Sequence, residues 1–196
     1  MKQIKIILAS ASPRRKELLN QIGLVPEIMA SEIDETVNSD IPKEVVEELS
    51  RKKAEHVWEI CKKTKKEADI VLGSDTVVSA GGKILGKPAS KEAAAEMIRL
   101  LAGNKHQVYT GVTLIGREVK ETFSEVTEVY VYPMTEKEIW DYVSLGESMD
   151  KAGAYGIQGH FAAHIKRIEG SYTNVMGLPV GSVYQHLMKL TEGQND

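Results

Sequence analysis

Hydrophobic and polar positions along the chain fall into short segments whose periods alternate between those of strands and those of helices. Runs of β-branched and aliphatic residues predict strands, whereas apolar residues three and four positions apart predict amphipathic helices. This alternation indicates an α/β fold with a mixed sheet, because the strands in the middle of the chain would pair locally. The expected strands are 4–9, 24–29, 69–72, 107–115, 119–132 and 163–168, and the expected helices are 12–22, 42–67, 90–101, 135–146 and a last one from residue 179.

Two arginines, Arg14 and Arg15, fall in the first turn of the helix expected at 12–22. Ser12 is a favourable N-cap, and the proline after it fits the first helical position. Because a helix N-terminus is electropositive, each cation there is unfavourable by about 0.3–1 kcal/mol. A bound phosphate would explain the pair, since small residues such as Ser10 and Ser12 let the backbone approach it while the guanidinium groups donate hydrogen bonds. A surface helix with incidental charges is the alternative.

Lys53 interrupts an otherwise apolar stripe on the helix expected at 42–67. Val45, Leu49 and Val57 lie on the same face at helical spacing. A lysine at the edge of such a stripe can carry its amine out to solvent. The other interpretation is an ammonium group held in a cleft against a phosphate, and the spacing alone does not decide between the two.

Asp75 follows the strand expected at 69–72, in a segment that we predict to be a turn. Ligands of open α/β sheets lie beyond the carboxyl ends of the strands, so an acid there could bind a metal or a water molecule. An aspartate that caps a turn is an equally good interpretation. The acidic residues Glu32, Asp34 and Glu35 could complete a site for a hard cation, although a solvated acidic loop is the simpler reading of them.

Two further patterns suggest chemistry that their context does not support. Residues 81–87, GGKILGK, match the start of a P-loop, but Pro88 stands where a Ser or Thr should hold Mg²⁺, and the first glycines predict a hairpin turn. Lys87 could still contact a phosphate as a point charge. His160 and His164 are four residues apart, but no helix is expected there and no third ligand is near in sequence. We therefore interpret them as ordinary histidines.

Composition limits the classes of protein to which the chain can belong. Its 196 residues suffice for one core, and we expect a single domain over residues 1–196 with two lobes. The formal net charge of −3 argues against general nucleic-acid binding, and no apolar run approaches the roughly 20 residues that cross a membrane. The apolar start is too short for a signal peptide, and the only cysteine is Cys61, on an apolar helix face. We therefore predict a reducing, cytoplasmic setting.

Short motifs distributed over nearly the whole chain carry a family resemblance. They are LASASPRRKELL at 8–19, DE at 34–35, KKA at 52–54, GSDTVV at 73–78, GKP at 86–88, YTGV at 109–112, KAGAYGIQG at 151–159 and GSYTNVMGLP at 170–179. In this order they resemble the Maf family of nucleotide pyrophosphatases. The resemblance implies a two-lobed α/β fold, with a mixed β-sheet, flanking helices and a central cleft, related to that of the inosine triphosphate pyrophosphatases.

The resemblance also implies which residues form the site and what each of them does. Asp75 would be the proton acceptor, Lys53 and Glu35 would act beside it, and a divalent cation, Mg²⁺ or Mn²⁺, would be held by Glu35 and Asp75. The positions that set base preference in the family correspond to Arg14, Thr76 and Gln158, a combination similar to that of the group acting on dTTP and UTP. The remaining substrate-binding residues would be Ser10, Ser12, Arg15 and Lys87.

We therefore expect hydrolysis of dTTP, UTP or modified pyrimidine nucleotides to a monophosphate and pyrophosphate, as house-cleaning of nucleotide pools and with a link to cell-division arrest. The expected partner is the nucleotide, without nucleic acid or membrane and with a homodimer left open. One alternative is a non-catalytic nucleotide-binding regulator of cell division, against which Glu35, Lys53 and Asp75 together argue. The other is an inosine triphosphate-type pyrophosphatase, against which the SASPRR start argues.

Overall fold

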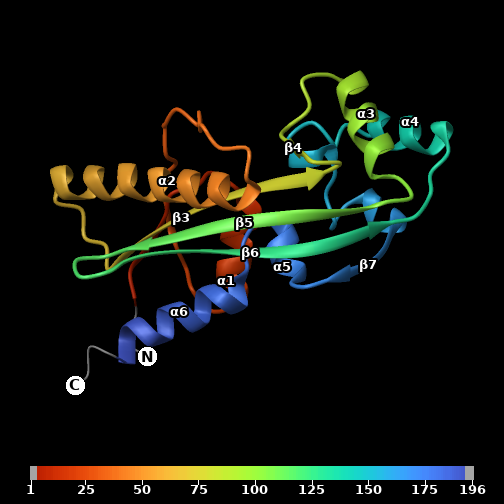
Figure 1. The fold of residues 1–196 in the computed structure, drawn as a ribbon. Coiled ribbons are helices and arrows are strands. Elements are labelled where there is room, and N and C mark those ends of the chain that lie inside the picture. The colour runs from red at the N-terminus through yellow and green to blue at the C-terminus, as the bar shows by residue number, and fades with distance from the viewer. Residues whose placement is uncertain (1–3, 193–196) are drawn as a thin grey trace. The chain divides into compact units, whose positions relative to one another are not determined.

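The computed structural model describes residues 4–192, and within them seven strands form one mixed sheet (Figure 1). The strand order is β2-β1-β3-β5-β6-β7, and β4 pairs with β3 outside this path. The strands are β1 (Ile6–Leu8), β2 (Glu27–Ile28), β3 (Ile70–Ala80), β4 (Lys83–Leu85), β5 (Lys105–Ile115), β6 (Lys120–Val131) and β7 (Ile165–Glu169). The helices are α1 (Pro13–Gln21), α2 (Pro42–Thr64), α3 (Lys91–Leu101), α4 (Glu136–Ser144), α5 (Tyr172–Met176) and α6 (Val180–Glu192), with 3-10 helices η1 (Ala152–Ala154) and η2 (His160–His164). The expected α/β class with a mixed sheet is confirmed.

The chain forms two compact units. The first comprises the residues up to 75, residues 110–125 and those from 177 onward, and the second comprises residues 76–109 and 126–176. Strands β3, β5 and β6 each contribute residues to both units. The expectation of a single two-lobed domain stays a prediction.

Parallel pairing organises the first unit. β1 lies between β2 and β3 and runs parallel to both, with Ile7 opposite Glu27 on one side and Val71 on the other. Parallel neighbours need long connections, and α1 and α2 lie in them. The buried residues of one core cluster in this unit are Ile7, Ala9, Ala54, Val57, Cys61, Val71 and Ile115. Cys61 is therefore a packing residue, as predicted.

Helices cover both faces of the sheet in the first unit, α2 on one side and α1 and α6 on the other (Figure 1). Because successive side chains of a strand point to opposite faces of the sheet, neighbouring residues of β6 should contact helices on opposite faces. Ser124 donates a hydrogen bond to Glu47 on α2, whereas the ring of Phe123 stacks on His186 of α6. Successive residues of one strand thus contact different helices.

In the second unit, β3 turns into β4 through Gly81 and Gly82, which both have positive φ, so the predicted hairpin turn is confirmed. β7 pairs antiparallel with β6. The buried ring of Phe161 contacts the rings of Tyr142 and Tyr155 at centroid distances of 5.0 and 4.8 Å. The core around Phe161 is thus aromatic, whereas the core cluster of the first unit is mainly aliphatic.

Two expectations about the elements were wrong, and one element was missed. The strand expected to end at residue 72 continues to Ala80, because the β-branched residues after 75 remain in the sheet and pair with β4. Residues 160–164 do form a helix, the short 3-10 helix η2, although none was expected. The five-residue helix α5 was not anticipated, since so short a segment shows no clear period. Over residues 4–192, no helix combines the length and the apolar character that crossing a membrane would need.

Candidate functional site

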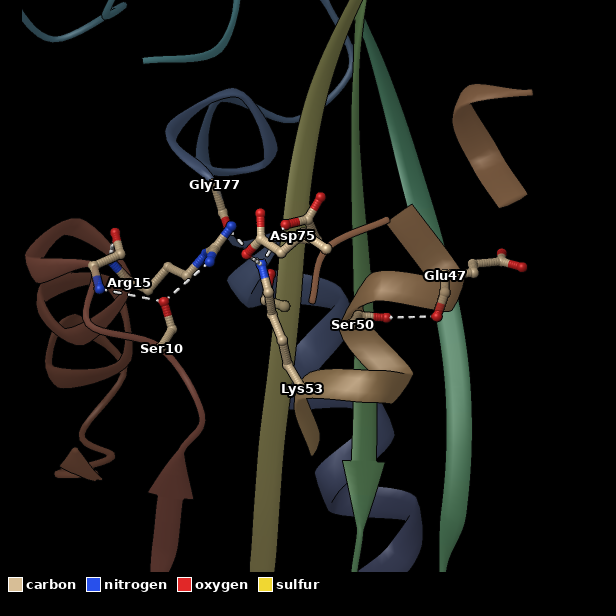
Figure 2. Close-up of polar contacts among 10 residues, drawn as sticks. Ser10, Arg15, Glu47, Ser50, Lys53, Asp75 and Gly177 are labelled. Atoms are coloured by element: carbon tan, nitrogen blue, oxygen red, sulfur yellow. Dashed lines mark hydrogen bonds and ion pairs between the residues drawn. The ribbon is translucent and has the colours of Figure 1, made fainter. Parts of the chain in front are cut away.

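An ion-pair cluster centred on Lys53 lies at the contact of α2 with β3 (Figure 2). The Nζ atom of Lys53 is 2.6 Å from Oδ1 of Asp75 and 2.8 Å from Oε1 of Glu35. The side chains of Lys53 and Asp75 are only 11% and 12% exposed, whereas that of Glu35 is 62% exposed. One ammonium group therefore binds one buried and one solvent-facing carboxylate.

The amphipathic pattern of α2 explains why its lysine is buried. Val45, Leu49 and Val57 are buried on the same helix face as Lys53, so the stripe turns the lysine toward the sheet and not toward solvent. The amine ends on Asp75, and the interpretation of a lysine that carries its amine into solvent was wrong. Burying a charge is expensive without a partner of opposite sign, and Asp75 provides one.

Asp75 was expected in a turn after a strand. It lies instead inside the 11-residue strand β3. The prediction of a turn was wrong: Gly, Ser and Asp are typical of turns, but here the strand continues through all three. Side chains two apart in a strand share a face, so the carboxylate of Asp75 points to the same side as Gly73. That is the side on which α2 packs, because a Cβ atom at Gly73 would meet backbone atoms of α2. The aspartate is thus fixed by the sheet.

The start of α1 forms a second part of the site. Ser12 is the N-cap and accepts a hydrogen bond from the Arg15 backbone amide, as predicted. The guanidinium group of Arg15 folds back: its Nη1 donates to Ser10 Oγ at 3.0 Å and its Nε donates to the Gly177 carbonyl at 2.8 Å (Figure 2). Two donors of Arg15 are therefore used to fix its orientation.

Burial lowers the pKa of the Arg15 guanidinium, and the negative charge of Asp75 opposes that shift. The neighbouring charge of Arg14 lowers the same pKa, and that of Glu35 raises it. Arginine nevertheless stays protonated in proteins. The two parts of the site thus belong to one electrostatic environment, with Arg14, Arg15 and Lys53 as cations and Glu35 and Asp75 as anions.

Gly177 was not anticipated as a site residue, although it lies in the GSYTNVMGLP motif at 170–179. Its carbonyl accepts hydrogen bonds from both Arg15 Nε and Ser74 Oγ, and its φ of 113° lies in the region that favours glycine. Gly177 thereby connects the start of α1 to β3. The sequence signal that could have found it is the Gly-Leu-Pro stop before the last helix, which requires a special backbone conformation at the glycine.

The acidic loop contributes one residue to the cluster. Asp34 Oδ1 accepts hydrogen bonds from the amide and hydroxyl of Thr36 at 2.9 and 2.6 Å, which lowers the pKa of Asp34 and makes it a turn cap. Glu32 is exposed, and Glu35 contacts Lys53. Of the three acids, Glu35 is the one that contacts the buried cluster, through Lys53. The interpretation as a solvated acidic loop is therefore correct for Glu32 and Asp34 and wrong for Glu35.

No group of three or more His, Cys, Asp or Glu that could enclose a metal occurs among the described residues. Glu35 and Asp75, however, converge on one ammonium group and so lie within reach of one cation. Mg²⁺ is usually bound by one or two carboxylates, with waters and substrate phosphates as its other ligands. The two carboxylates fit a cation of this kind, whose other ligands are waters and phosphates, and do not fit an all-protein metal cage.

The remaining predicted residues belong to the second unit, apart from Arg14, which is half-buried in the first turn of α1. Thr76 follows Asp75 in β3 and is half-buried. Lys87 and Gln158 are exposed, after β4 and after η1 respectively. The roles proposed for these residues stay predictions. His160 contacts Glu147, and the interpretation of the two histidines as ordinary ones stays a prediction.

Comparison with known proteins gives a consistent result. A family model described as Maf-like protein matches residues 5–190. A dTTP/UTP pyrophosphatase of Agathobacter rectalis is 48% identical, over 95% of this chain and 97% of its own length. Proteins of the same name from Lachnoclostridium phytofermentans and Carboxydothermus hydrogenoformans are 45% and 47% identical, over 94% of this chain and 94% and 97% of their own lengths. The match extends over nearly the whole chain, and the protein belongs to the Maf-like family.

Proposed function

We propose that this protein hydrolyses nucleoside triphosphates, with dTTP and UTP as preferred substrates, to a nucleoside monophosphate and pyrophosphate. The relatives that match over nearly their whole length carry the name dTTP/UTP pyrophosphatase. The observation that carries the proposal is the buried Lys53–Asp75 pair with Glu35 beside it. A buried carboxylate oriented by an ammonium group can accept a proton from a water molecule, a step that hydrolysis needs and simple nucleotide binding does not.

Asp75 is the proposed proton acceptor. Its Oδ1 atom accepts a hydrogen bond from Lys53 at 2.6 Å. The second carboxylate oxygen then accepts a proton from the attacking water, whose oxygen forms the new bond to phosphorus as the bond to pyrophosphate breaks. Positioned general bases contribute about 10²–10⁴-fold to rates. Lys53 acts in this scheme by orienting Asp75 and by placing positive charge near the phosphates.

The N-terminus of α1 is the proposed phosphate-binding element. The cations Arg14 and Arg15 offer hydrogen-bond donors to a group of several negative charges, and the electropositive end of the helix favours such a group. Arg15 is pre-oriented by Ser10 and Gly177, so little conformational entropy is lost when it binds. A bound polyanion removes the unfavourable interaction between two cations and the helix dipole.

Glu35 and Asp75 are the proposed ligands of a divalent cation, Mg²⁺ or Mn²⁺. Such an ion, when bound, neutralises phosphate charge and acidifies a water molecule. Lys87 is proposed as a further phosphate contact, and Arg14, Thr76 and Gln158 as the residues that read the base. The amide of Gln158 can accept a hydrogen bond from the pyrimidine N–H and donate one to a carbonyl, which suits thymine and uracil. We place the activity in the cytoplasm.

The test is pyrophosphate release from a panel of dTTP, UTP, ITP and 7-methyl-GTP, with Mg²⁺, with Mn²⁺ and with neither. We expect the highest kcat/KM with dTTP and UTP, and dependence on the added metal. Tight nucleotide binding without turnover would support a non-catalytic regulator instead. A preference for ITP would assign the chain the specificity of inosine triphosphate pyrophosphatases.

A further inference from the structure

The contact between α2 and the sheet in the first unit is unusually close at two glycines on different strands. A Cβ atom at Gly73 of β3 would lie 2.2 Å from the carbonyl oxygen of Ser50 and 2.8 Å from the amide nitrogen of Ala54. A Cβ atom at Gly111 of β5 would lie 2.2 Å from the carbonyl oxygen of Val46. These neighbours are backbone atoms, so no side-chain rotation could make room. Any residue other than glycine would push the helix outward.

A buried hydrogen bond fixes the helix at the same place. The hydroxyl group of Ser50, which is fully buried, lies 3.0 Å from the hydroxyl group of Thr113 and donates to the Glu47 carbonyl. Thr113 continues the chain of hydroxyl groups to Thr122 on β6 at 2.9 Å. A polar group buried in a helix-sheet contact is costly unless it is paired, so this bond selects one position of α2 along the sheet.

The two strands share one arrangement. Gly73 is followed two residues later by Asp75, and Gly111 is followed two residues later by Thr113, so in each strand both residues face the same side. In each case the glycine admits the helix backbone and the polar residue contacts a helix side chain, Lys53 for Asp75 and Ser50 for Thr113. Figure 2 shows Ser50 and Lys53 one turn apart on α2, with the lysine reaching Asp75.

We propose that Gly73 and Gly111 are positioning residues for the reaction: together with the Ser50–Thr113 bond they set how closely α2 approaches the sheet, and so bring the Lys53 ammonium onto Asp75. The inference rests on the proposed function for its effect on rate. A Cβ atom only 2.2 Å from a backbone carbonyl oxygen is about 1 Å too close, so the helix must move by about that distance, and displacements of that size can cost about 10²-fold in rate.

Gly111→Ala is the informative variant, because Gly111 lies on a different strand from Asp75. We expect kcat to fall at least about tenfold with KM changed less than about threefold, since a displaced Lys53 impairs the chemical step. Gly181→Ala is the matched control: nothing lies within 4 Å of its added Cβ atom. Its kcat should equal that of the wild type.

A double-variant experiment separates positioning from general damage. Arginine is longer than lysine, so Lys53→Arg should partly span the added distance in the Gly111→Ala background. We expect the double variant to be at least about threefold more active than the product of the two single effects. Strictly multiplicative losses would overturn the proposal, because they would show that Gly111 does not act through Lys53.

The last measurement needs no turnover: lysine amidination by methyl acetimidate, mapped by mass spectrometry. Lys53 is 11% exposed and should react slowly in the wild type, and at least about threefold faster in Gly111→Ala, while the exposed Lys137 reacts alike in both. Unchanged Lys53 labelling would overturn the proposal. If Gly111→Ala fails to fold, Ser50→Ala adds no volume and takes its place, with the same labelling criterion. A wild type without pyrophosphatase activity would refute the proposed function, and the labelling would still decide whether the glycines position Lys53.

Discussion

Replacing Lys53 by methionine separates the contribution of the apolar stripe on α2 from that of the buried ion pair. Considered as a helix face alone, Lys53→Met completes the stripe and should be neutral or stabilising. The structure predicts the opposite, because the substitution leaves the carboxylate of Asp75 buried without its ammonium partner. The side chain of Asp75 is only 12% exposed, so water does not replace the lost partner. Glu35, the other partner of Lys53, is itself negatively charged and cannot compensate.

The expected loss in free energy of unfolding follows from the cost of leaving one member of a buried ion pair without its partner. Such truncations destabilise proteins by about 3–5 kcal/mol, and the remaining charge of Arg15 near Asp75 favours the lower end, about 3 kcal/mol. Small domains have free energies of unfolding of about 5–15 kcal/mol, so the variant should still fold. Adding Asp75→Asn removes the uncompensated charge, and the double variant should return to within about 1 kcal/mol of the wild type.

Urea denaturation followed by circular dichroism measures these differences. Lys52→Met is the matched control on the same helix. Its amine pairs with Glu48 and donates to the Thr36 carbonyl, both in solvent-accessible contacts, so its loss should cost no more than about 1 kcal/mol. The reasoning fails if Lys53→Met is as stable as the wild type, or if the double variant is no more stable than Lys53→Met alone.

Three other predictions concern rate, specificity and pH. Asp75→Asn should lower kcat by at least about 10² while nucleotide binding, measured by calorimetry, persists; near-normal turnover would exclude Asp75 as the base. Combining Arg14→Trp, Thr76→Gln and Gln158→Glu should shift kcat/KM from dTTP and UTP toward 7-methyl-GTP by up to about 10²-fold, and an unchanged ratio would mean that these residues do not read the base. Burial lowers the pKa of His106 to about 4. Because the unfolded chain then binds the proton more readily, stability should fall as the pH drops from about 6.5 toward 4, by up to about 3 kcal/mol. Unfolding titrations of His106→Gln should show a weaker pH dependence, and an identical one would contradict this.

Features that depend on neighbouring residues could be read from the sequence. The N-cap at Ser12 and the turn at Gly81 and Gly82 need only a few adjacent positions, and all were predicted correctly. The amphipathic pattern of α2 and the alternation of elements also gave the fold class. Local signals were sufficient because capping bonds, turn conformations and helix periodicity are short-range properties of the chain.

The site depended on tertiary structure. Lys53 had two interpretations in the sequence, and the choice between them came from Asp75, 22 residues away, and Glu35. Arg15 and the Gly177 carbonyl are separated by 162 residues, so no local pattern could show that the arginine is held in place. Asp75 was expected in a turn because Gly73 and Ser74 before it are typical of turns, whereas pairing with other strands keeps this segment in β3. The sequence by itself determined the types of the elements and the candidate residues; which of those residues lie within bonding distance was decided by the packing of α2 and β3, since such contacts form only when distant segments meet.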